Sequence, residues 1–391
     1  MKDSSTARAL RAQLVAELEQ DGSIRTEPWR RAVSDVPRHL FVPAFCTDGP
    51  GPDGITRYTP VPQGTGEWLT LAYRNRTWVT QLDHGATSTT DGPVTGTPTS
   101  SSTLPGVVVR MLEDLEVGDD SRVLEVGTGT GYSTALLCAR VGPERVASVE
   151  FDPGLSRAAR DRLESLGYRP RLMVGDGALG APAHAPFERI IATYSPGRIP
   201  AAWLEQSVPG AVILASLAGS LDAYGYVRLD VRTPERAEGR FIDGRVSFML
   251  SRGTRRPALG PLLRAALDAR RHTAAADTAV HPAVLDETGL LWAVQLALPG
   301  VTRLTLATNG GTGCWLLHPD GSWAVLESAP GGGVRVCQGG PRALWSTVEA
   351  VVSRWLGDGR PGLGRYGLTV TPEANSVWLD TPDRPVGVLA G

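Results

Sequence analysis

Apolar positions in the middle of the chain alternate between short continuous runs and amphipathic stretches of about ten residues. The runs that predict strands are 122–126, 146–150, 171–174, 189–193 and 211–217. The stretches that predict helices are 105–115, 132–141, 153–166 and 200–208. Short apolar strands separated by helices are typical of a parallel sheet covered on both faces. We therefore expect an α/β fold with a doubly wound, mostly parallel sheet, which strands at 224–231 and 245–250 could close with an antiparallel edge.

The segments on either side of this region have different patterns. Residues 8–20 and the stretch leading into Val36 predict helices, whereas 46–100 is rich in Gly, Thr, Pro and Asp, with one strand candidate at 76–81. Loops this long are often functional, so we expect a lid-like cover over a site. After Ser251 we expect a helix at 260–271, strands at 291–298, 303–308, 314–318, 323–327 and 333–337, and a helix at 341–356.

The length of 391 residues is enough for two domains. The change of composition near 250–260 places the boundary between them. We expect N-terminal helices and the cover at 1–100, a ligand-binding core at 101–252, and a smaller α+β accessory domain at 253–391.

Composition narrows the class of protein further. The chain is 41% hydrophobic and 20% charged with a net charge of −2, which excludes a disordered chain and gives no electrostatic reason to expect a nucleic-acid partner. Neither a signal peptide nor an apolar run of about 18 residues is present, so we expect a cytoplasmic protein with no membrane partner. The four cysteines lie far apart without CxxC spacing, which favours buried thiols over a metal site.

The strongest chemical signal is the segment 122–132, RVLEVGTGTGY, in which a strand runs into a glycine-rich turn and a helix. Such a turn presents backbone N–H groups at the carboxyl end of a parallel sheet, where open α/β folds bind ligands. Glu125 ends the strand, and a carboxylate there would repel a pyrophosphate but attract a cation. S-adenosylmethionine carries an ammonium and a sulfonium group, so it fits this acid better than a dinucleotide, whose fingerprint is GxGxxG.

Two further acids follow at the ends of the next two strands. Glu150 ends the second strand and can accept hydrogen bonds from both ribose hydroxyls, and Asp176 follows the third strand, where it can accept one from the adenine amino group. Three acids at three successive strand ends seldom arise by chance. The alternative is that each acid only caps the helix that follows it.

The motifs RVLEVGTGTGY, SVEFD, VGDG and APFERIIAT, followed by IPAAWLEQSVPGA, resemble the protein-L-isoaspartate O-methyltransferase family in order and spacing over residues 8–250. The upstream segment VPRHLFVP is similar to the N-terminal signature of that family. The resemblance implies a Rossmann-like class I methyltransferase fold, S-adenosyl-L-methionine as donor and S-adenosyl-L-homocysteine as product. It places on the cofactor the residues Glu125, Gly127, Thr128, Gly129, Gly131, Tyr132, Glu150, Phe151, Asp176 and Gly177.

The acceptor side departs from the family pattern. Where the family carries Thr-Ile-Ser-x-Pro, this chain has Ser101-Ser102-Thr103-Leu104-Pro105, so the resemblance implies that Thr103 and Ser102 act beside the methyl donor and that Ser101 contacts the substrate. Capping of the helix near Pro105 is the alternative role of Ser102 and Thr103. Thr193 and Tyr194 stand where the family has a small Ala-rich stretch, so we expect both at the acceptor pocket, with Tyr194 altering its wall.

In this family the acceptor is a carboxylate, which is already a nucleophile near neutral pH. The enzyme therefore needs chiefly to hold the oxygen in line with the sulfonium methyl group, about 3 Å away, and to exclude water. Esterification replaces a poor leaving group with a good one, so the next backbone nitrogen can attack the ester carbon, expel methanol and close a succinimide, whose hydrolysis gives aspartate or isoaspartate.

The C-terminal third does not resemble the repair enzymes, which usually end soon after the last sheet strand. Family members with such an extension resemble those associated with ribosomal peptide natural products, namely lanthipeptides, lasso peptides and ATP-grasp-crosslinked peptides. We therefore expect methylation of an aspartyl carboxylate in a cyclised precursor peptide, which leads to aspartimide or isoaspartate. The alternatives are general isoaspartate repair, a non-catalytic peptide-binding module and a small-molecule O-methyltransferase.

Overall fold

The computed structural model describes residues 4–87, 92–244, 246–252, 257–308, 311–328 and 333–389. The chain forms two compact units: unit 1 comprises Met1–Tyr194, Pro200–Leu214 and Asp230–Pro234, and unit 2 comprises Ser195–Ile199, Ala215–Leu229 and Glu235–Gly391. Two long strands, β9 (Ser207–Ala218) and β10 (Tyr224–Thr233), contribute residues to both units. In this division residues 1–100 lie in one unit with residues 101–194, whereas most of 195–252, expected in the ligand-binding core, lies in unit 2.

Unit 1 begins with the two expected helices. Helix α1 (Ser5–Gln20) is capped by Ser4, whose hydroxyl accepts a hydrogen bond from the N–H of Ala7 at 3.1 Å. Helix α2 (Glu27–Asp35) has a proline in its first turn and buries Trp29. A short 3-10 turn at Arg38–Leu40 then leads toward the first strand.

The expected cover at 46–100 is a four-stranded antiparallel sheet instead of a long loop. Its strands are β1 (Ala44–Pro50), β2 (Thr56–Pro62), β3 (Trp78–Leu82) and β4 (Pro98–Ser102), in the order β2-β1-β3-β4, with α3 (Trp68–Ala72) between β2 and β3. Phe45 and Trp78 stack at 4.7 Å between ring centroids in its small core. Residues 88–91 of the expected cover lie outside the described residues. Strand β4 leads directly into the core, so this sheet ends beside the candidate site.

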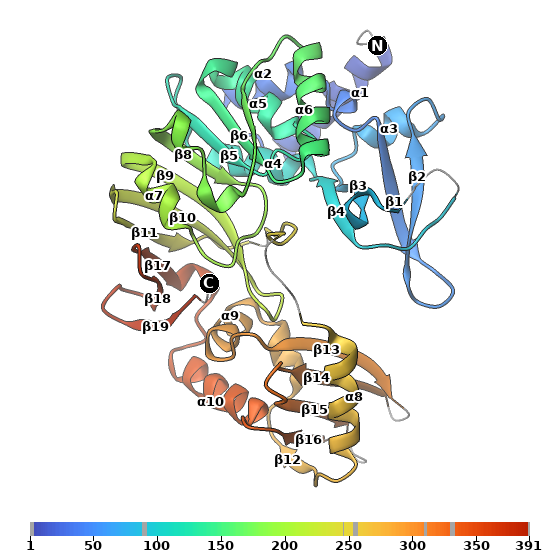
Figure 1. The fold of residues 1–391 in the computed structure, drawn as a ribbon, viewed down its shortest axis with the longest axis vertical. Coiled ribbons are helices and arrows are strands. Elements are labelled where there is room, and N and C mark those ends of the chain that lie inside the picture. Colours follow the sequence, from blue (N-terminus) through green and yellow to red (C-terminus); the bar gives the residue numbers. More distant parts are fainter. Residues whose placement is uncertain are drawn as a thin grey trace. The chain divides into compact units, whose positions relative to one another are not determined.

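The core of unit 1 confirms the predicted alternation of strands and helices (Figure 1). The elements are α4 (Pro105–Asp114), β5 (Val123–Val126), α5 (Tyr132–Val141), β6 (Val146–Glu150), α6 (Pro153–Ser165), β7 (Arg171–Val174), β8 (Phe187–Ala192) and α7 (Ala201–Glu205). The strands follow the order β9-β8-β5-β6-β7, and every neighbouring pair is parallel. The chain moves outward from β5 to β7 and returns to β8 on the other side of β5. Open α/β sheets bind ligands at the carboxyl ends of strands where the order reverses in this way.

In unit 2, β10 is followed in its sheet by β11 (Arg236–Phe241), β17 (Tyr366–Val370), β18 (Asn375–Leu379) and β19 (Pro385–Val388). The last four strands pair antiparallel. The strand predicted at 245–250 is wrong: residues 246–250 form only an isolated bridge between Leu250 and Ser195, and Arg245 lies outside the described residues. The strand that follows β10 is the polar segment β11, which has no apolar run to reveal it.

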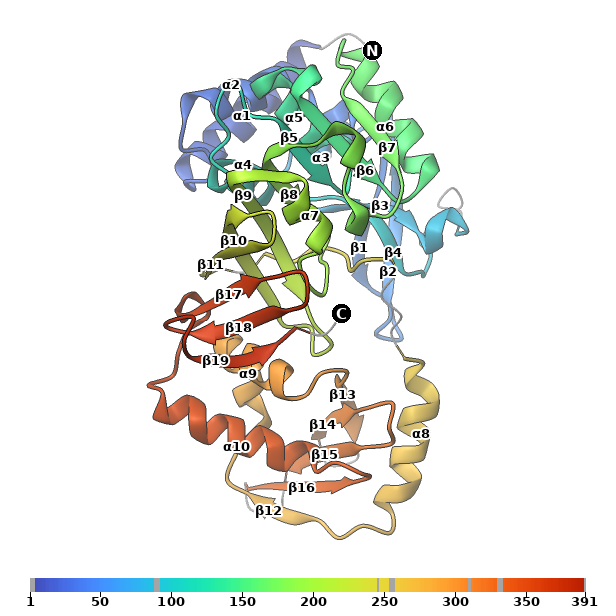
Figure 2. The same cartoon turned by 60° about the vertical axis from the view of Figure 1, so that its left-hand side comes forward.

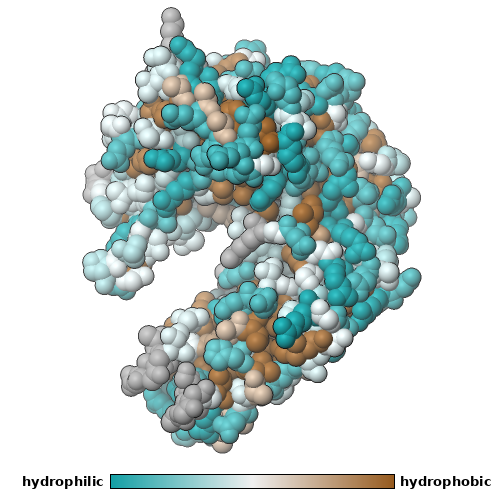
Figure 3. Space-filling model, turned by 180° about the vertical axis from the view of Figure 1, so that it is seen from behind, coloured by the Kyte–Doolittle hydropathy of each residue, from teal (hydrophilic) through white to brown (hydrophobic). Residues whose placement is uncertain are grey.

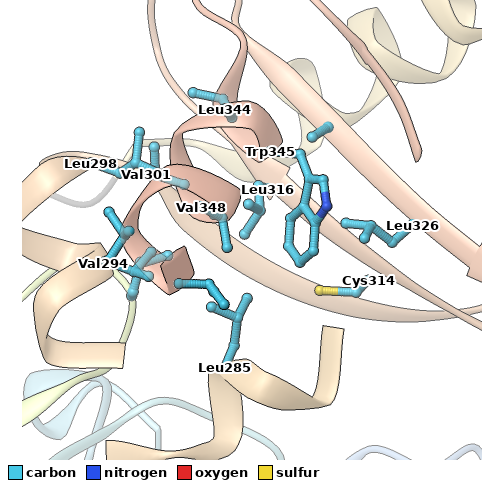
Figure 4. Packing of buried hydrophobic residues seen from close by; sticks show 14 of the residues in the cluster. Leu285, Val294, Leu298, Val301, Cys314, Leu316, Leu326, Leu344, Trp345 and Val348 are labelled. Atoms are coloured by element: carbon cyan, nitrogen blue, oxygen red, sulfur yellow. The ribbon is translucent and has the colours of Figure 1, made fainter. Parts of the chain in front are cut away.

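Unit 2 also contains an antiparallel sheet with the order β12-β16-β15-β14-β13. These strands are β12 (Ala276–Thr278), β13 (Thr302–Thr308), β14 (Gly311–Leu317), β15 (Trp323–Ser328) and β16 (Val334–Gly339). Figure 2 shows α8 (Leu259–Arg270) and α10 (Leu344–Gly357) on opposite sides of it. Successive side chains of β14 point to opposite faces of the sheet. Leu316 packs with Trp345 of α10 (Figure 4), whereas Trp315 packs with Ala266 of α8.

One predicted element of unit 2 has the wrong type. The run at 291–298 was predicted as a strand, but residues 291–297 lie in helix α9 (Thr288–Ala297) and Leu298 is its C-cap. Periodicity cannot distinguish a buried helix from a strand where nearly every residue is apolar. The structure buries Leu290, Val294 and Leu298, which are spaced by four residues as on one helix face.

Burial of the cysteines agrees with the prediction from the sequence, and tryptophans of unit 2 are buried as well. Trp315, Trp323 and Trp345 are buried in the cores of unit 2, and all four cysteines are buried without disulfide bonds. On the face shown in Figure 3, hydrophilic residues predominate and hydrophobic residues are exposed among them. Of the helices in the described ranges, none is both long enough and apolar enough to cross a membrane.

Candidate methyl-donor and acceptor site

The glycine-rich turn between β5 and α5 has a backbone that favours glycine. Gly127, Gly129 and Gly131 have φ angles of 106°, 54° and 89°, in the left-handed region. A Cβ atom on Gly127 would lie 2.7 Å from Oγ1 of Thr193, and one on Gly131 would lie 3.1 Å from Cβ of Ala159. The turn therefore lies closely against its neighbours, and its shape depends on the missing side chains.

Glu125 supports this turn from inside the fold. Its carboxylate is 0% exposed and accepts hydrogen bonds from the hydroxyls of Ser133, Thr134 (2.5 Å) and Ser148 (2.7 Å). Burial raises the pKa of Glu125, although the three hydroxyl hydrogen bonds oppose this shift. Ser148 also lies 2.6 Å from Oγ1 of Thr128, which joins the acid to the turn. The sequence predicted a direct contact between Glu125 and a cation, whereas the structure gives the carboxylate no exposed surface and three partners inside the protein.

Glu150, at the end of β6, holds the other side of the turn. Its Oε2 accepts a hydrogen bond from the N–H of Gly129 at 2.8 Å, and its Oε1 accepts one from the N–H of Asp152 at 3.0 Å. The residue is 6% exposed, whereas the next residue, Phe151, is 54% exposed. The end of β6 therefore combines a nearly buried acid with an exposed aromatic ring.

Asp176 follows β7 and is exposed. Its Oδ1 accepts a hydrogen bond from the N–H of Ala178 at 2.9 Å, so one of its two oxygens caps the helical turn that follows, as in the capping alternative. Among the described residues this is the one hydrogen bond of the carboxylate, which leaves Oδ2 available. Val174, the last residue of β7, is 55% exposed, so an apolar surface from Val174 and Phe151 lies at two neighbouring strand ends.

The predicted acceptor residues lie at the end of β4. The carbonyl oxygen of Ser101 lies 3.8 Å from the Cβ position of Gly129, which brings this strand end to the glycine turn. Ser102 is buried, and its Oγ has no hydrogen-bond partner in the described part of the chain. Thr103 follows and is partly exposed.

The alternative role of Ser102 and Thr103 as caps of α4 is not found. Leu104 is the N-cap residue of that helix and provides no side-chain cap. The first N–H groups are satisfied from another segment instead: Leu104 donates to Oγ1 of Thr77 at 3.0 Å, and Gly106 donates to Oδ1 of Asn75 at 2.9 Å. The hydroxyl of Thr103 is therefore not needed by its own helix.

Thr193 and Tyr194 follow β8. Thr193 lies against Gly127 and Tyr194 against Gly177, both of which are predicted to contact the methyl donor. Oγ1 of Thr193 donates to the carbonyls of Gly127 (2.5 Å) and Val126 (3.1 Å), so this hydroxyl fastens β8 to the end of β5. The ring of Tyr194 comes within 3.5 Å of the Cβ position of Gly177 and packs edge-on against Trp203 at 6.5 Å. Burial, with the nearby charge of Asp176, raises the pKa of Tyr194.

Tyr132, also predicted on the cofactor, is buried at the start of α5 with no partner for its hydroxyl in the described residues. Burial raises its pKa to about 12. The guanidinium of Arg38 lies 5.9 Å from the centroid of its ring. Arg38 was not predicted as a site residue, because a buried arginine has no pattern that distinguishes it from an exposed one. The one feature of the sequence that could have pointed to a role for Arg38 is its position in the VPRHLFVP segment.

A parallel sheet of this order, with a glycine turn at its reversal point and acids after β6 and β7, defines a Rossmann-like class I methyltransferase that uses S-adenosylmethionine. Comparisons with known proteins agree. The model of the protein-L-isoaspartate(D-aspartate) O-methyltransferase family matches residues 74–222. The chain belongs to the protein-L-isoaspartate O-methyltransferase family.

Three relatives illustrate the extent of the similarity. The chain is 32% identical to the protein-L-isoaspartate O-methyltransferase of Methylorubrum populi over 249 residues, which are 64% of this chain and 95% of that protein. It is 35% identical to that of Halorhodospira halophila over 248 residues, 62% of this chain and 92% of that protein. A solved structure of a protein-L-isoaspartate O-methyltransferase aligns with 95% of this chain and 100% of its own, at a TM-score of 0.53 and 19% identity.

The solved structure bears on the C-terminal extension. Its alignment covers nearly the whole of this chain, so the fold similarity includes most of unit 2 as well as the methyltransferase core.

Proposed function

We propose that the protein transfers a methyl group from S-adenosylmethionine to a carboxylate oxygen at an aspartyl or isoaspartyl position of a peptide. The observation that carries this proposal is the approach of the β4 end to the glycine turn, within 3.8 Å between Ser101 O and the Cβ position of Gly129. The predicted acceptor residues Ser102 and Thr103 follow Ser101 directly in the chain, which supports a site where donor and acceptor meet. Membership of the family supports the same reaction.

The residues at the strand ends fit S-adenosylmethionine. The turn at 127–131 has no side chains at its three glycines, so its backbone can be approached closely. Asp176 has an available carboxylate oxygen for the adenine amino group, and Glu150 has acceptor capacity left for ribose hydroxyls. Phe151 and Val174 supply an exposed apolar surface of the kind that an adenine ring covers. When bound, the donor supplies an electrophilic methyl group.

The acceptor needs little chemical activation from the protein. As the carboxylate oxygen forms its bond to the methyl carbon, the bond from that carbon to sulfur breaks and its electron pair stays on sulfur. No proton has to be removed, so the residues of this chain have to orient the carboxylate and exclude water. The partly exposed Thr103 can donate a hydrogen bond to one carboxylate oxygen while the other oxygen reacts. Ser102, whose hydroxyl has no partner among the described residues, lies next to it in the chain.

Two acceptors are compatible with this chemistry. The first is an ordinary aspartate in a cyclised precursor peptide, which is favoured by the departures from the family pattern at Thr103 and Tyr194. The second is isoaspartate in damaged proteins, which is favoured by relatives at 31–35% identity that carry the repair enzyme's name. In both cases the methyl ester leads to a succinimide without further catalysis.

The test compares three acceptors of matched sequence: a linear isoaspartyl peptide, a linear aspartyl peptide and a cyclised aspartyl peptide. Ester formation is followed by mass spectrometry at a fixed concentration of S-adenosylmethionine. Methylation restricted to the cyclised peptide supports the tailoring role, and equal rates on any linear isoaspartyl peptide support repair. An absence of ester on all three peptides would overturn the proposed reaction.

A further inference from the structure

Arg38 is 0% exposed, and its guanidinium joins two segments that meet beside the acceptor residues. Its Nη1 donates to the carbonyls of Ala72 (2.6 Å) and Arg74 (2.9 Å). Its Nη2 donates to the carbonyls of Arg76 (3.0 Å) and Thr103 (3.4 Å). The planar guanidinium therefore binds three carbonyls of the 72–77 turn and the carbonyl of Thr103. The ammonium group of a lysine could not donate four hydrogen bonds in this arrangement.

The 72–77 turn in turn holds the start of α4 in place. Its side chains Asn75 and Thr77 accept the hydrogen bonds from Gly106 and Leu104 described above, which replace the missing cap of that helix. Arg38 thus acts on the backbone at 103–106 in two ways, directly through Thr103 and indirectly through the turn. Both routes end on the backbone between Thr103 and Gly106.

The charge of Arg38 is also unusual. In the residues that the structure describes, Arg38 forms no ion pair with a carboxylate, and its Nε has no acceptor. Burial lowers its pKa to about 10, so the group stays charged near neutral pH. A desolvated cation that is balanced only by carbonyl dipoles favours negative charge nearby.

We propose that Arg38 is the positioning residue of the acceptor site, which holds Thr103 beside the glycine turn and favours an acidic acceptor there through its unneutralised charge. This inference rests on the proposed function, since Thr103 is the residue assigned to the acceptor carboxylate. Arg38 touches neither substrate nor donor in this arrangement. Its loss should therefore change acceptor use more than donor binding.

The test uses Arg38→Lys, which keeps the charge, and Arg38→Met, which removes it. Arg140→Lys is the matched control, because Arg140 is also a largely buried arginine of unit 1 that donates to a carbonyl, that of Val117 at 2.9 Å. Thr77→Val removes one of the two hydrogen bonds of the indirect route, the one from Leu104, and leaves Arg38 in place. Each variant is assayed for kcat and KM with whichever peptide the wild type methylates, and for the Kd of S-adenosylmethionine by calorimetry.

We expect Arg38→Lys to lower kcat/KM for the acceptor by roughly tenfold or more and Arg38→Met to lower it further, with the Kd for S-adenosylmethionine within about threefold of wild type. Thr77→Val should lower kcat in the same direction, and Arg140→Lys should leave all three constants unchanged. Unchanged kcat/KM in Arg38→Lys, or an equal loss of donor affinity, would overturn the proposal.

A second readout does not depend on the acceptor. Hydrogen exchange of the amides at 72–77 and 101–106 should be faster in Arg38→Lys than in wild type, and unchanged in Arg140→Lys. If the wild type methylates none of the peptides, the proposed function fails and this readout still decides the positioning role. Unchanged exchange in both segments would then refute it.

Discussion

The carboxylate of Glu150 accepts a hydrogen bond from the backbone N–H of Gly129 at 2.8 Å. An acid at the end of β6 therefore holds the glycine turn at the end of β5, in addition to the ribose contact predicted for it. A carboxylate has acceptor capacity for both partners, whereas an amide has lost one acceptor and the charge.

Glu150→Gln should accordingly raise the Kd for S-adenosylmethionine by roughly ten- to a hundredfold, the range expected for loss of a hydrogen bond to a charged group. Calorimetric titration measures it. Glu144→Gln is the matched control, because Glu144 is exposed and forms an ion pair with Arg145 at the opposite end of β6. An equal effect in both variants, or none in either, would contradict the role of Glu150.

Asp176 offers a test that separates capping from ligand binding. Asp176→Asn keeps an oxygen that can accept the hydrogen bond from Ala178 but removes the charge, whereas Asp176→Ala removes both. If Asp176 binds the donor, both variants should weaken S-adenosylmethionine binding by about tenfold or more. If it serves only as a cap, Asp176→Asn should bind as wild type does and only Asp176→Ala should differ.

Gly127 tests the close packing of the glycine turn. Gly127→Ala should lower the free energy of unfolding by roughly 2–4 kcal/mol. The alanine would have to adopt a left-handed φ, and its Cβ would lie 2.7 Å from Thr193 Oγ1. Gly167→Ala has a similar φ of 82° but no atom within 4 Å, so it should lose only about 1 kcal/mol and keep full donor affinity. Urea unfolding and calorimetry measure the two effects. Equal losses in the two variants would show that the contact with Thr193 is unimportant.

Variants of Tyr194 distinguish effects on donor binding from effects on acceptor choice. Tyr194→Phe keeps the edge-on contact with Trp203, whereas Tyr194→Ala restores the small residue of the family pattern and leaves Gly177 without its neighbouring ring. We expect Tyr194→Ala to raise the ratio of activity on the linear isoaspartyl peptide to that on the cyclised peptide, and to weaken donor binding by about tenfold. Tyr194→Phe should change neither. The same ratio in all three proteins would remove Tyr194 from acceptor selection.

Glu125 predicts a pH dependence of stability. Its pKa is raised above the ordinary value of 4.5, so its contribution to stability is complete below pH 4.5 and is lost as the pH rises through the pKa of the folded state. Glu125→Gln does not titrate there. The unfolding free energy of wild type relative to this variant should therefore fall as the pH rises above 4.5. Urea unfolding over a series of pH values measures it, and a constant or rising difference would contradict the burial of this charge.

The parallel core could be predicted because its signals are local. The strands from β5 to β8 are short apolar or β-branched runs, and the helices between them have amphipathic spacing. The N-terminal sheet could not be predicted in the same way, since β1 and β2 contain Pro, Gly and Asp and depend on pairing with each other. Strand β17 pairs with β11 across more than a hundred residues, and no local pattern records such a pairing. Strands β18 and β19 then extend the sheet from β17.

The site was predicted in part for the same reason. Acids at strand ends are visible in the sequence, so Glu150 and Asp176 were found at the edge where they lie. The direction of the Glu125 carboxylate was not predictable, because it depends on hydroxyls from α5 and β6 that come together only in the fold. The role of Arg38 depends on four carbonyl groups, which no side-chain pattern reveals.

Transfer of a labelled methyl group from S-adenosylmethionine to the three matched peptides, with the product treated in alkali, tests the central claim most directly. The account predicts one methyl group on an aspartyl or isoaspartyl carboxylate, released as methanol in alkali, with incorporation by the wild type and much less by Asp176→Ala. Label that resists alkali, or no label on any peptide from a wild type that binds S-adenosylmethionine, would contradict it.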